Sequence, residues 1–503
     1  MSRRFLDYIL CILSSILLAL SFPKFNFWFF GWVGLLPLFF ALQGKRPIFS
    51  FLLSYLTGFL FFLLTIYWLI HVTLLGFLLL AAYLAIYFGL FGFLIGVFSN
   101  KPPIFKLFLF PSIWVVLEFL RSNLLSGFGW ALLGYSQYRN LAVIQISDIL
   151  GSYGVSFLIV MVNVAIWVLV SEGRGQRSEV RKVFFCLLSS VFCLLAVISY
   201  GLFKLNYQLP TTNYQQLKVS VIQGNIPQEI KWDETSWPLI LDKYINLTRQ
   251  VSKDKPSLII WPETAYPGYL ADKPQLLKEI LNLAKELRTN FLLGAITTKD
   301  FSIYNSAILI SSEGKLSKAY HKLHLVPFGE YVPFRGIFSF LPELAVLGDF
   351  TKGKEYTVFS LNKDNSAKFS VLICFEDTIP YLSRQFVKKG ANLLINITND
   401  AWFKDTSAPF QHLQASVFRA IENRCPLVRC ANTGVSAFID ENGRIIDMVL
   451  EGNNKATFIS GYKTKEIKLK NSNSFYSRFG DLFVLACLLI FISGIFKFWR
   501  ISV

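Results

Sequence analysis

Long apolar blocks occupy most of the first 204 residues and constrain the fold more than any other feature. They lie near residues 5–22, 26–43, 48–70, 74–98, 104–120, 155–171 and 183–203, and an eighth lies near 481–499. Most of them approach the ~20 residues that an α-helix needs to cross the core of a bilayer. Only 16% of the residues are charged, which is low for a soluble protein. We therefore predict a polytopic α-helical membrane bundle of eight spans.

The distribution of basic residues predicts the orientation of this bundle. If the amino terminus is cytoplasmic, only Lys24, Arg121 and Arg139 fall on the short external loops between the first seven spans. The basic residues at cytoplasmic positions are Arg3, Arg4, Lys45, Arg46, Lys101, Lys106, Arg174, Arg177, Arg181, Lys182, Lys497 and Arg500. Because cytoplasmic loops are enriched in Lys and Arg, this bias places both termini in the cytoplasm and the large polar segment outside it.

The same bias explains much of the formal net charge of +17. A basic protein can bind nucleic acid, but no basic run is interleaved here with aromatic residues. We therefore predict no nucleic-acid partner, and we interpret the mild basic excess of the polar segment as suited to an anionic membrane surface.

One external loop, residues 121–154, has an unusual composition. Five glycines make it irregular, and Trp130, Tyr135, Tyr138 and Tyr153 are typical of an interfacial aromatic belt. Glu118 and Arg121 end the preceding span. Two interpretations remain open: an interfacial connection with a snorkelling arginine, or a site for a lipid headgroup, because charged groups within a span are usually functional.

The pattern changes to α/β between residues 217 and 467. Short β-rich runs are predicted as strands at 218–223, 257–261, 291–296, 307–311, 369–373, 393–397, 427–431 and 437–440. Helical patterns cover 274–289 and 411–423. Alternating strands and helices indicate α/β layers. The predicted organisation is a membrane domain over 1–204, an external α/β domain over 217–467 and a last transmembrane helix over 481–499.

Three features with chemical potential each follow a predicted strand. Glu263 stands in W-P-E, Lys322 in H-K and Cys374 in C-F-E-D, and strand ends in an α/β layer meet at one edge, where ligands bind. Each residue has an ordinary alternative: a neighbour of a helix N-cap, a surface charge and a buried core thiol. The segment has no Gly-rich phosphate loop and the chain has only four histidines, so metal and Ser-His-Asp chemistry are poorly supplied.

Taken together, the three motifs resemble those of the nitrilase (carbon–nitrogen hydrolase) superfamily over residues 217–465. The resemblance implies an αββα sandwich in which Glu263 is the general base, Lys322 stabilises the tetrahedral intermediate and Cys374 is the nucleophile. These roles suit the residue types, because a thiol must lose its proton before it attacks and a lysine charge stabilises an oxyanion. Glu330 can supply the counter-charge that a lysine inside a site needs.

With the membrane half included, the chain resembles the apolipoprotein N-acyltransferase family. The matching stretches are Gln223–Gln228 with Lys231-Trp232, Leu325–Pro333, Asn399–Phe403, Gln411-His412, Glu118–Arg121, Gly127-Phe128 and Gly134–Gln137. The resemblance implies that Cys374 takes the sn-1 acyl chain of a phospholipid, typically phosphatidylethanolamine, as a thioester. The acyl chain then passes to the α-amine of a diacylglyceryl-cysteine at an apolipoprotein amino terminus.

The family resemblance carries further expectations. Trp232, Glu330, Phe375 and Glu376 are expected to support the site or bind its substrates, with no cofactor and no metal. The protein is expected to be a monomer in the bacterial inner membrane with its catalytic domain in the periplasm. Two positions depart from the family pattern: Phe375 stands where relatives often have tyrosine, and Phe128-Gly129-Trp130 where they often have F-P-W.

Other residues leave alternatives open. Cys425 and Cys430 flank an apolar strand, which favours buried free thiols over a disulfide. The stretch 399–403 is either a mobile loop over the site or a packed turn anchored by Trp402, and His412 starts a helix or borders the site. At the level of function, the competing hypotheses are a membrane-anchored amidase and a lipid-binding or transport protein with an inactive domain.

Overall fold

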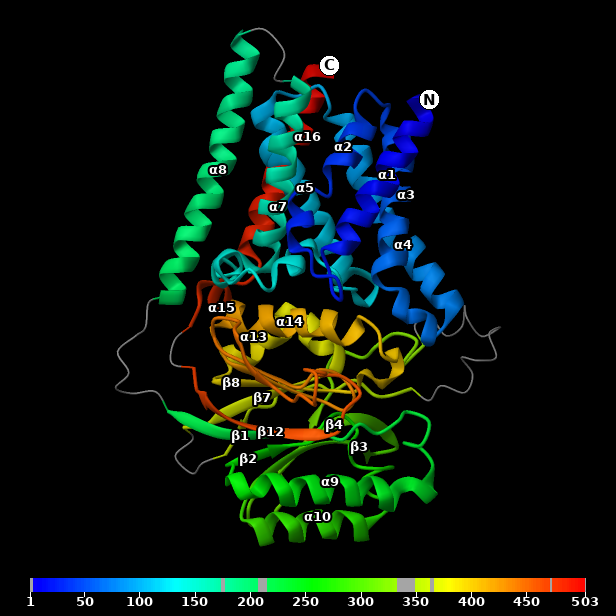
Figure 1. Cartoon of the computed structure of the whole chain (residues 1–503), viewed down its shortest axis with the longest axis vertical. Coiled ribbons are helices and arrows are strands. Elements are labelled where there is room, and N and C mark those ends of the chain that lie inside the picture. Colours follow the sequence, from blue (N-terminus) through cyan, green and yellow to red (C-terminus); the bar gives the residue numbers. More distant parts are fainter. Residues whose placement is uncertain are drawn as a thin grey trace. The chain divides into compact units, whose positions relative to one another are not determined.

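The computed structural model describes residues 3–172, 177–206, 215–332, 349–361, 366–470 and 473–502. The chain divides into two compact units. The helical unit comprises Met1–Gln208 and Ser474–Val503, and the α/β unit comprises Leu209–Asn473. Figure 1 labels the elements of both units, which are described separately below.

Ten α-helices are described in the helical unit. They are α1 (Arg3–Leu20), α2 (Leu36–Leu42), α3 (Pro47–Thr65), α4 (Leu74–Val97), α5 (Pro103–Asn123), α6 (Leu141–Ile144), α7 (Ser147–Glu172), α8 (Arg177–Asn206), α15 (Phe475–Phe479) and α16 (Leu482–Ser502). The most extensive helix pairing joins α3 to α4. Gly92 permits this approach, because a Cβ there would lie 2.4 Å from the Ser50 carbonyl oxygen.

Five of the described helices are long and apolar enough to cross a membrane, so the prediction of eight spans is wrong in number. They are Pro47–Thr65, Leu74–Val97, Pro103–Ser126, Ser147–Ser171 and Val183–Asn206. The predicted span at 5–22 falls on α1, which begins with three charged residues within five positions. The block at 26–43 is broken into a 3₁₀ turn (Trp28–Trp32) and the short α2, and within the described part of the last block the apolar helix is Leu482–Phe496.

The loop at 121–154 is irregular, as predicted, but its aromatic side chains do not form an exposed belt. The helix α5 ends at Asn123, short 3₁₀ turns follow, and α7 is kinked at Gly151. Trp130, Tyr135, Tyr138 and Tyr153 are all buried. Trp130 packs on the ring of Trp68. The aromatic residues that the sequence placed at a membrane interface are therefore part of the protein interior.

The α/β unit contains two mixed six-stranded sheets. The first has the order β12-β1-β2-β3-β4-β5, with bounds Gly461–Lys468, Gln216–Gln223, Leu258–Ile260, Asn290–Lys299, Ser302–Ile310 and Tyr320–His321. The second has the order β11-β10-β9-β8-β7-β6, with bounds Ile445–Met448, Ala437–Ile439, Leu427–Ala431, Leu393–Thr398, Lys368–Ile373 and Phe359–Ser360. The parallel strands β1-β2-β3 and β7-β8-β9 form the centres of the two sheets.

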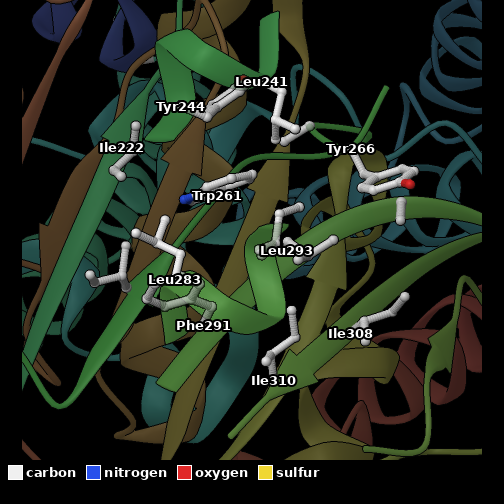
Figure 2. Close-up of a cluster of buried hydrophobic side chains, with 14 of the residues drawn as sticks. Ile222, Leu241, Tyr244, Trp261, Tyr266, Leu283, Phe291, Leu293, Ile308 and Ile310 are labelled. Atoms are coloured by element: carbon white, nitrogen blue, oxygen red, sulfur yellow. The ribbon is translucent and has the colours of Figure 1, made fainter. Parts of the chain in front are cut away.

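Helices cover the outer faces of both sheets, which gives four layers in the order α-β-β-α (Figure 1). The pair α9 (Trp237–Val251) and α10 (Pro274–Leu287) lies on the first sheet, and α13 (Pro380–Lys388) and α14 (Ala408–Asn423) lie on the second. A core of buried side chains joins α9 and α10 to strands β1–β4 (Figure 2). Trp261 lies in this core, where its indole nitrogen donates to the Thr248 hydroxyl of α9 at 3.0 Å.

The α/β fold predicted for this half is confirmed. All eight predicted strands lie on observed strands, and both predicted helices correspond to α10 and α14. The prediction missed the short or edge strands β5, β6, β11 and β12 and the helices α9 and α13. All four strands lie at the edges of their sheets, where each has a single neighbouring strand, and none of them carries a long apolar run.

Candidate active site

The three predicted catalytic residues follow three different strands of the α/β unit. Glu263 follows β2, Lys322 follows β5 and Cys374 follows β7, so both sheets contribute. Backbone strain marks two of these positions: Thr264, next to Glu263, has φ of 45°, and Cys374 has φ of 53°. Left-handed conformations of non-glycine residues are costly and concentrate at functional sites.

Glu263 is buried and tightly oriented. Its Oε1 accepts a hydrogen bond from Asn305 Nδ2 at 2.8 Å, and its Oε2 accepts one from the Asn399 backbone N–H at 2.9 Å. Gly294 allows the chain to pack against this turn, because a Cβ there would lie 2.7 Å from the Glu263 Cα. The carboxylate therefore keeps a fixed position without being fully paired by a cation.

Lys322 connects two carboxylates inside the site. Its Nζ lies 2.9 Å from Glu330 and 3.7 Å from Glu263 Oε1, and the lysine side chain is 1% exposed. Asn305 Nδ2 also donates to Glu330 Oε1 at 2.8 Å. Burial alone would lower the pKa of Lys322, but the carboxylates of Glu330 and Glu263 outweigh it and raise this pKa. Lys322 therefore keeps its positive charge at physiological pH.

Cys374 begins the short 3₁₀ turn that follows β7 and is partly exposed. Its carbonyl oxygen accepts hydrogen bonds from Asn396 Nδ2 at 3.0 Å and from His412 Nε2 at 3.2 Å. Burial raises the pKa of the Cys374 thiol, Glu263 raises it further, and Lys322 opposes both. The thiol is therefore protonated at neutral pH and needs a base in order to react.

Glu376 joins the turn that begins at Cys374, called the cysteine turn below, to the segment that contains Lys322. Its carboxylate accepts hydrogen bonds from the backbone N–H groups of Ile373 (2.8 Å), Leu323 (2.6 Å) and His324 (3.0 Å), and from the Tyr320 hydroxyl (2.9 Å). Burial raises the pKa of Glu376 to about 7, although Ile373 and Lys322 oppose the shift. Its contacts are those of a supporting residue.

The other predicted supporting residues differ in exposure. Glu330 is held by Lys322 and by the Val326 N–H at 2.9 Å. Phe375 stacks on the His324 ring with 6.0 Å between ring centroids. Trp232 is 49% exposed, so it is available to a ligand rather than to the core.

Three groups that contact Glu263 had no role in the sequence prediction. They are Asn305, the Asn399 N–H and Lys231, whose Nζ donates to the Glu263 carbonyl oxygen at 3.2 Å and to the Thr264 hydroxyl. Lys231 stands beside Trp232 in a matched stretch, which is the only sequence signal for it. Burial lowers the pKa of Lys231 to about 8, while Glu263 and Cys374 oppose the shift.

The open alternatives are resolved as follows. Cys425 and Cys430 are buried free cysteines. The stretch 399–403 forms a turn anchored by the buried Asp400, whereas Trp402 is 51% exposed, so the alternative of a turn anchored by this tryptophan is not supported. His412 borders the site. Among the described residues, no group of three or more His, Cys, Asp or Glu side chains could hold a metal ion.

Glu118 and Arg121 lie in the helical unit, both buried on α5. Glu118 Oε1 accepts a hydrogen bond from the Leu133 N–H at 2.8 Å. Arg121 donates to the carbonyl oxygens of Trp130 (2.7 Å) and Phe128 (3.2 Å). Both side chains therefore brace the irregular loop that follows them, and Arg121 does not snorkel.

Comparison with known proteins covers both units. The profile of the apolipoprotein N-acyltransferase N-terminal domain matches residues 14–165, and that of carbon-nitrogen hydrolase matches residues 218–460. The structure of Saccharomyces cerevisiae Nit3, a member of branch 10 of the nitrilase superfamily, aligns with a TM-score of 0.38 at 19% identity. That alignment covers 50% of this chain and 90% of Nit3.

Full-length relatives carry one name. An apolipoprotein N-acyltransferase of Geobacter metallireducens is 39% identical over 501 residues, covering 96% of this chain and 93% of that protein. Apolipoprotein N-acyltransferase 1 of Treponema denticola is 29% identical over 536 residues, covering 97% of this chain and 95% of that protein. The chain therefore belongs to the apolipoprotein N-acyltransferase family.

Proposed function

We propose that this protein moves the sn-1 acyl chain of a phospholipid to the α-amine of a diacylglyceryl-cysteine at the amino terminus of an apolipoprotein. The observation that carries the proposal is the arrangement around Glu263: a fixed carboxylate, a lysine held charged at 3.7 Å, and a protonated cysteine coupled electrostatically to both. Acyl transfer through a cysteine requires these three groups: a base, a positive charge for the oxyanion and a thiol nucleophile. Phosphatidylethanolamine is the proposed donor.

In the first step Glu263 accepts the thiol proton while Cys374 Sγ attacks the ester carbonyl carbon. An S–C bond forms, and the carbonyl π electrons move onto oxygen, where the Lys322 charge stabilises them. The C–O ester bond then breaks, and Glu263 returns the proton to the departing oxygen. The products are a thioester on Cys374 and a lysophospholipid with a free hydroxyl group.

In the second step the neutral α-amine of the acceptor attacks the thioester carbon. A C–N bond forms, the C–S bond breaks, and the proton lost by nitrogen passes through Glu263 to the departing thiolate. The cysteine thiol is regenerated, and the acceptor carries an amide. No cofactor and no metal enters either step.

The proposed location is the bacterial inner membrane, with the α/β unit on the periplasmic side. The apolar helices of the helical unit support a membrane location, and the excess of basic residues in the loops assigned to the cytoplasm supports the orientation. Alkaline phosphatase fused after residue 470 should be active, whereas a fusion after residue 101 should be inactive. The reverse pattern contradicts the orientation.

A labelling experiment tests the chemistry. Purified full-length protein in phosphatidylethanolamine vesicles with a labelled sn-1 chain should acquire a hydroxylamine-sensitive label, and a diacylglyceryl-cysteine peptide should discharge it. The variant Cys374→Ser should not acquire a thioester label. The variant Cys425→Ser is the matched control and should label like the wild type, because Cys425 lies in the core. Equal labelling of Cys374→Ser, or turnover of a soluble amide without lipid, contradicts the proposal.

A further inference from the structure

Four buried ionisable side chains form a closed ring that contacts the cysteine turn; we call it the ion ring. His412 of α14 lies between two carboxylates: Nε2 is 2.8 Å from Asp377 Oδ1 and Nδ1 is 2.9 Å from Asp400 Oδ1. Arg429 of β9 closes the ring, with its terminal nitrogens 3.0 Å from Asp377 Oδ2 and 3.1 Å from Asp400 Oδ2. The four side chains are at most 1% exposed.

The geometry of the ion ring requires a protonated histidine. A neutral imidazole has only one N–H, so one of its nitrogens would present a lone pair to a carboxylate oxygen. An imidazolium donates to both carboxylates, and the ring then holds two positive and two negative charges. Burial and Arg429 lower the pKa of His412, but Asp377 and Asp400 outweigh them and raise it.

The ion ring holds the nucleophile turn through two hydrogen bonds. His412 Nε2 lies 3.2 Å from the Cys374 carbonyl oxygen, which also accepts from Asn396 Nδ2 at 3.0 Å. Asn396 is itself fixed to the ring, because its Oδ1 accepts from Arg429 at 2.8 Å. Two donors thus stabilise the carbonyl of a residue whose φ of 53° is unfavourable.

The same ring holds the base from a different direction. Asp400 begins the turn that follows Asn399, and the Asn399 backbone N–H donates to Glu263 Oε2 at 2.9 Å. The Asn399 side chain is fixed in turn by Asn432 Nδ2 at 3.0 Å. One charge-balanced cluster therefore contacts both the cysteine peptide and the segment that orients the carboxylate.

We propose that His412 is a positioning residue that, as an imidazolium, holds Cys374 and Glu263 in the relative position needed for proton transfer. His412 acts through the Cys374 carbonyl and Asp400. Its deprotonation would leave one uncompensated negative charge in the buried ring and remove one of two donors, either Nδ1–H to Asp400 or the Nε2–H that Asp377 shares with the Cys374 carbonyl. The inference rests on the proposed function only where it concerns the acyl-transfer rate.

The variant His412→Gln tests the rate. Rates are expressed per titratable Cys374, counted by alkylation of the full-length protein in vesicles. We expect the rate constant of Cys374 acylation to fall about 100-fold, since small misplacements of reacting groups cost that much, with the KM for phospholipid unchanged. Wild-type acylation should also decline more steeply at alkaline pH than acylation by His412→Gln, because only the wild type loses an imidazolium there, whereas Lys231 beside Glu263 titrates in both proteins.

The matched control is Glu422→Gln, which removes a different buried charge from the same helix. Glu422 pairs with Arg419 at 2.8 Å, and both side chains are fully buried. This variant should unfold at a lower temperature but retain the wild-type rate per titrated site. Equal loss per site in both variants, or a wild-type rate in His412→Gln, overturns the proposal.

A second measurement needs neither lipid nor a folded variant. The chain has only four histidines, so selective ¹⁵N-histidine labelling gives a spectrum that can be resolved by nuclear magnetic resonance. At pH 8, well above the ordinary histidine pKa of about 6.5, one histidine should still show two protonated ring nitrogens. Four neutral imidazoles at pH 8 overturn the ion ring. If the imidazolium is present but wild-type Cys374 accepts no acyl chain, the proposed function fails and the ring stands.

Discussion

Two sets of buried charged side chains, one in the helical unit and one in the α/β unit, are bound in different ways. In the helical unit Arg121 donates to backbone carbonyls and Glu118 accepts from a backbone N–H. In the α/β unit Lys322 lies between two carboxylates, and the four members of the ion ring pair with one another. The first arrangement fixes the path of a loop. The second keeps charged side chains next to the strained backbone of Cys374.

The difference shows why burial of charge does not by itself locate a functional site. A buried charge bound by main-chain groups has its hydrogen bonds satisfied locally and stabilises one loop conformation. Glu263, by contrast, is bound by an amide and an N–H, and the nearest lysine nitrogen lies 3.7 Å away, an arrangement that suits its proposed role as a base. The comparison predicts different effects of removing a cation from each unit.

The largest effect is expected from Lys322→Met. The substitution removes the proposed oxyanion partner, so acylation should fall about 10²–10³-fold or more. It also leaves Glu263 and Glu330 buried without a cation, which should lower the free energy of unfolding by about 3–5 kcal/mol. Single-turnover labelling of Cys374 and thermal unfolding measure the two effects.

The double variant Lys322→Met with Glu330→Gln separates stability from chemistry. It removes one of the two orphaned carboxylates, so much of the stability should return while acylation stays low. If acylation recovers together with stability, Lys322 has a structural role only, and the contrast between the two units fails.

A smaller effect on acylation, though not on stability, is expected from Arg121→Leu in the helical unit. Loss of charge-assisted bonds to the Trp130 and Phe128 carbonyls should cost about 1.5–3 kcal/mol of stability per bond at most. Acylation per titrated Cys374 should stay within about twofold, as for substitutions away from a site. Arg139→Leu is the control on the exposed part of the same loop. A raised KM for phospholipid in Arg121→Leu alone would instead support a headgroup site.

Patterns of apolar residues predicted the central parts of the α/β unit well. The parallel strands β2, β7 and β8 are buried on both faces and read as continuous apolar runs. The residues at their ends could therefore be placed at one edge, and chemistry with the family resemblance supplied their roles. The same patterns overestimated the number of spans, because hydropathy alone joined the 26–43 block into one helix, whereas Gly31, Gly34 and Pro37 lie where a 3₁₀ turn and a short helix divide it.

Contacts between distant segments could not be predicted from one sequence. Asn305 donates to Glu263, 42 positions earlier in the chain. Asp400 contacts Arg429 and His412 only because the turn after β8, the strand β9 and the covering helix α14 lie close together. Neither local propensity nor periodicity carries this information. Trp402 shows the same limit, since the sequence left open whether this large aromatic side chain anchors a turn, and the small buried Asp400 anchors it instead.

The smallest effect is expected from Lys231→Met, which removes a buried cation whose nearest acceptors are a carbonyl and a hydroxyl oxygen. The pKa of Lys231 is lowered by burial to about 8 in the folded protein, against about 10.4 in an unfolded chain. The folded state therefore binds its proton more weakly, so the burial cost is fully present below pH 8. This cost fades between pH 8 and about 10.4, because the lysine becomes neutral first in the folded state.

Wild-type stability relative to Lys231→Met should accordingly rise with pH across this window, by at most about 3 kcal/mol, as thermal unfolding at pH 7 and pH 10 can measure. A constant difference between the two proteins across this window would show that Lys231 keeps an ordinary affinity for its proton and would contradict the prediction.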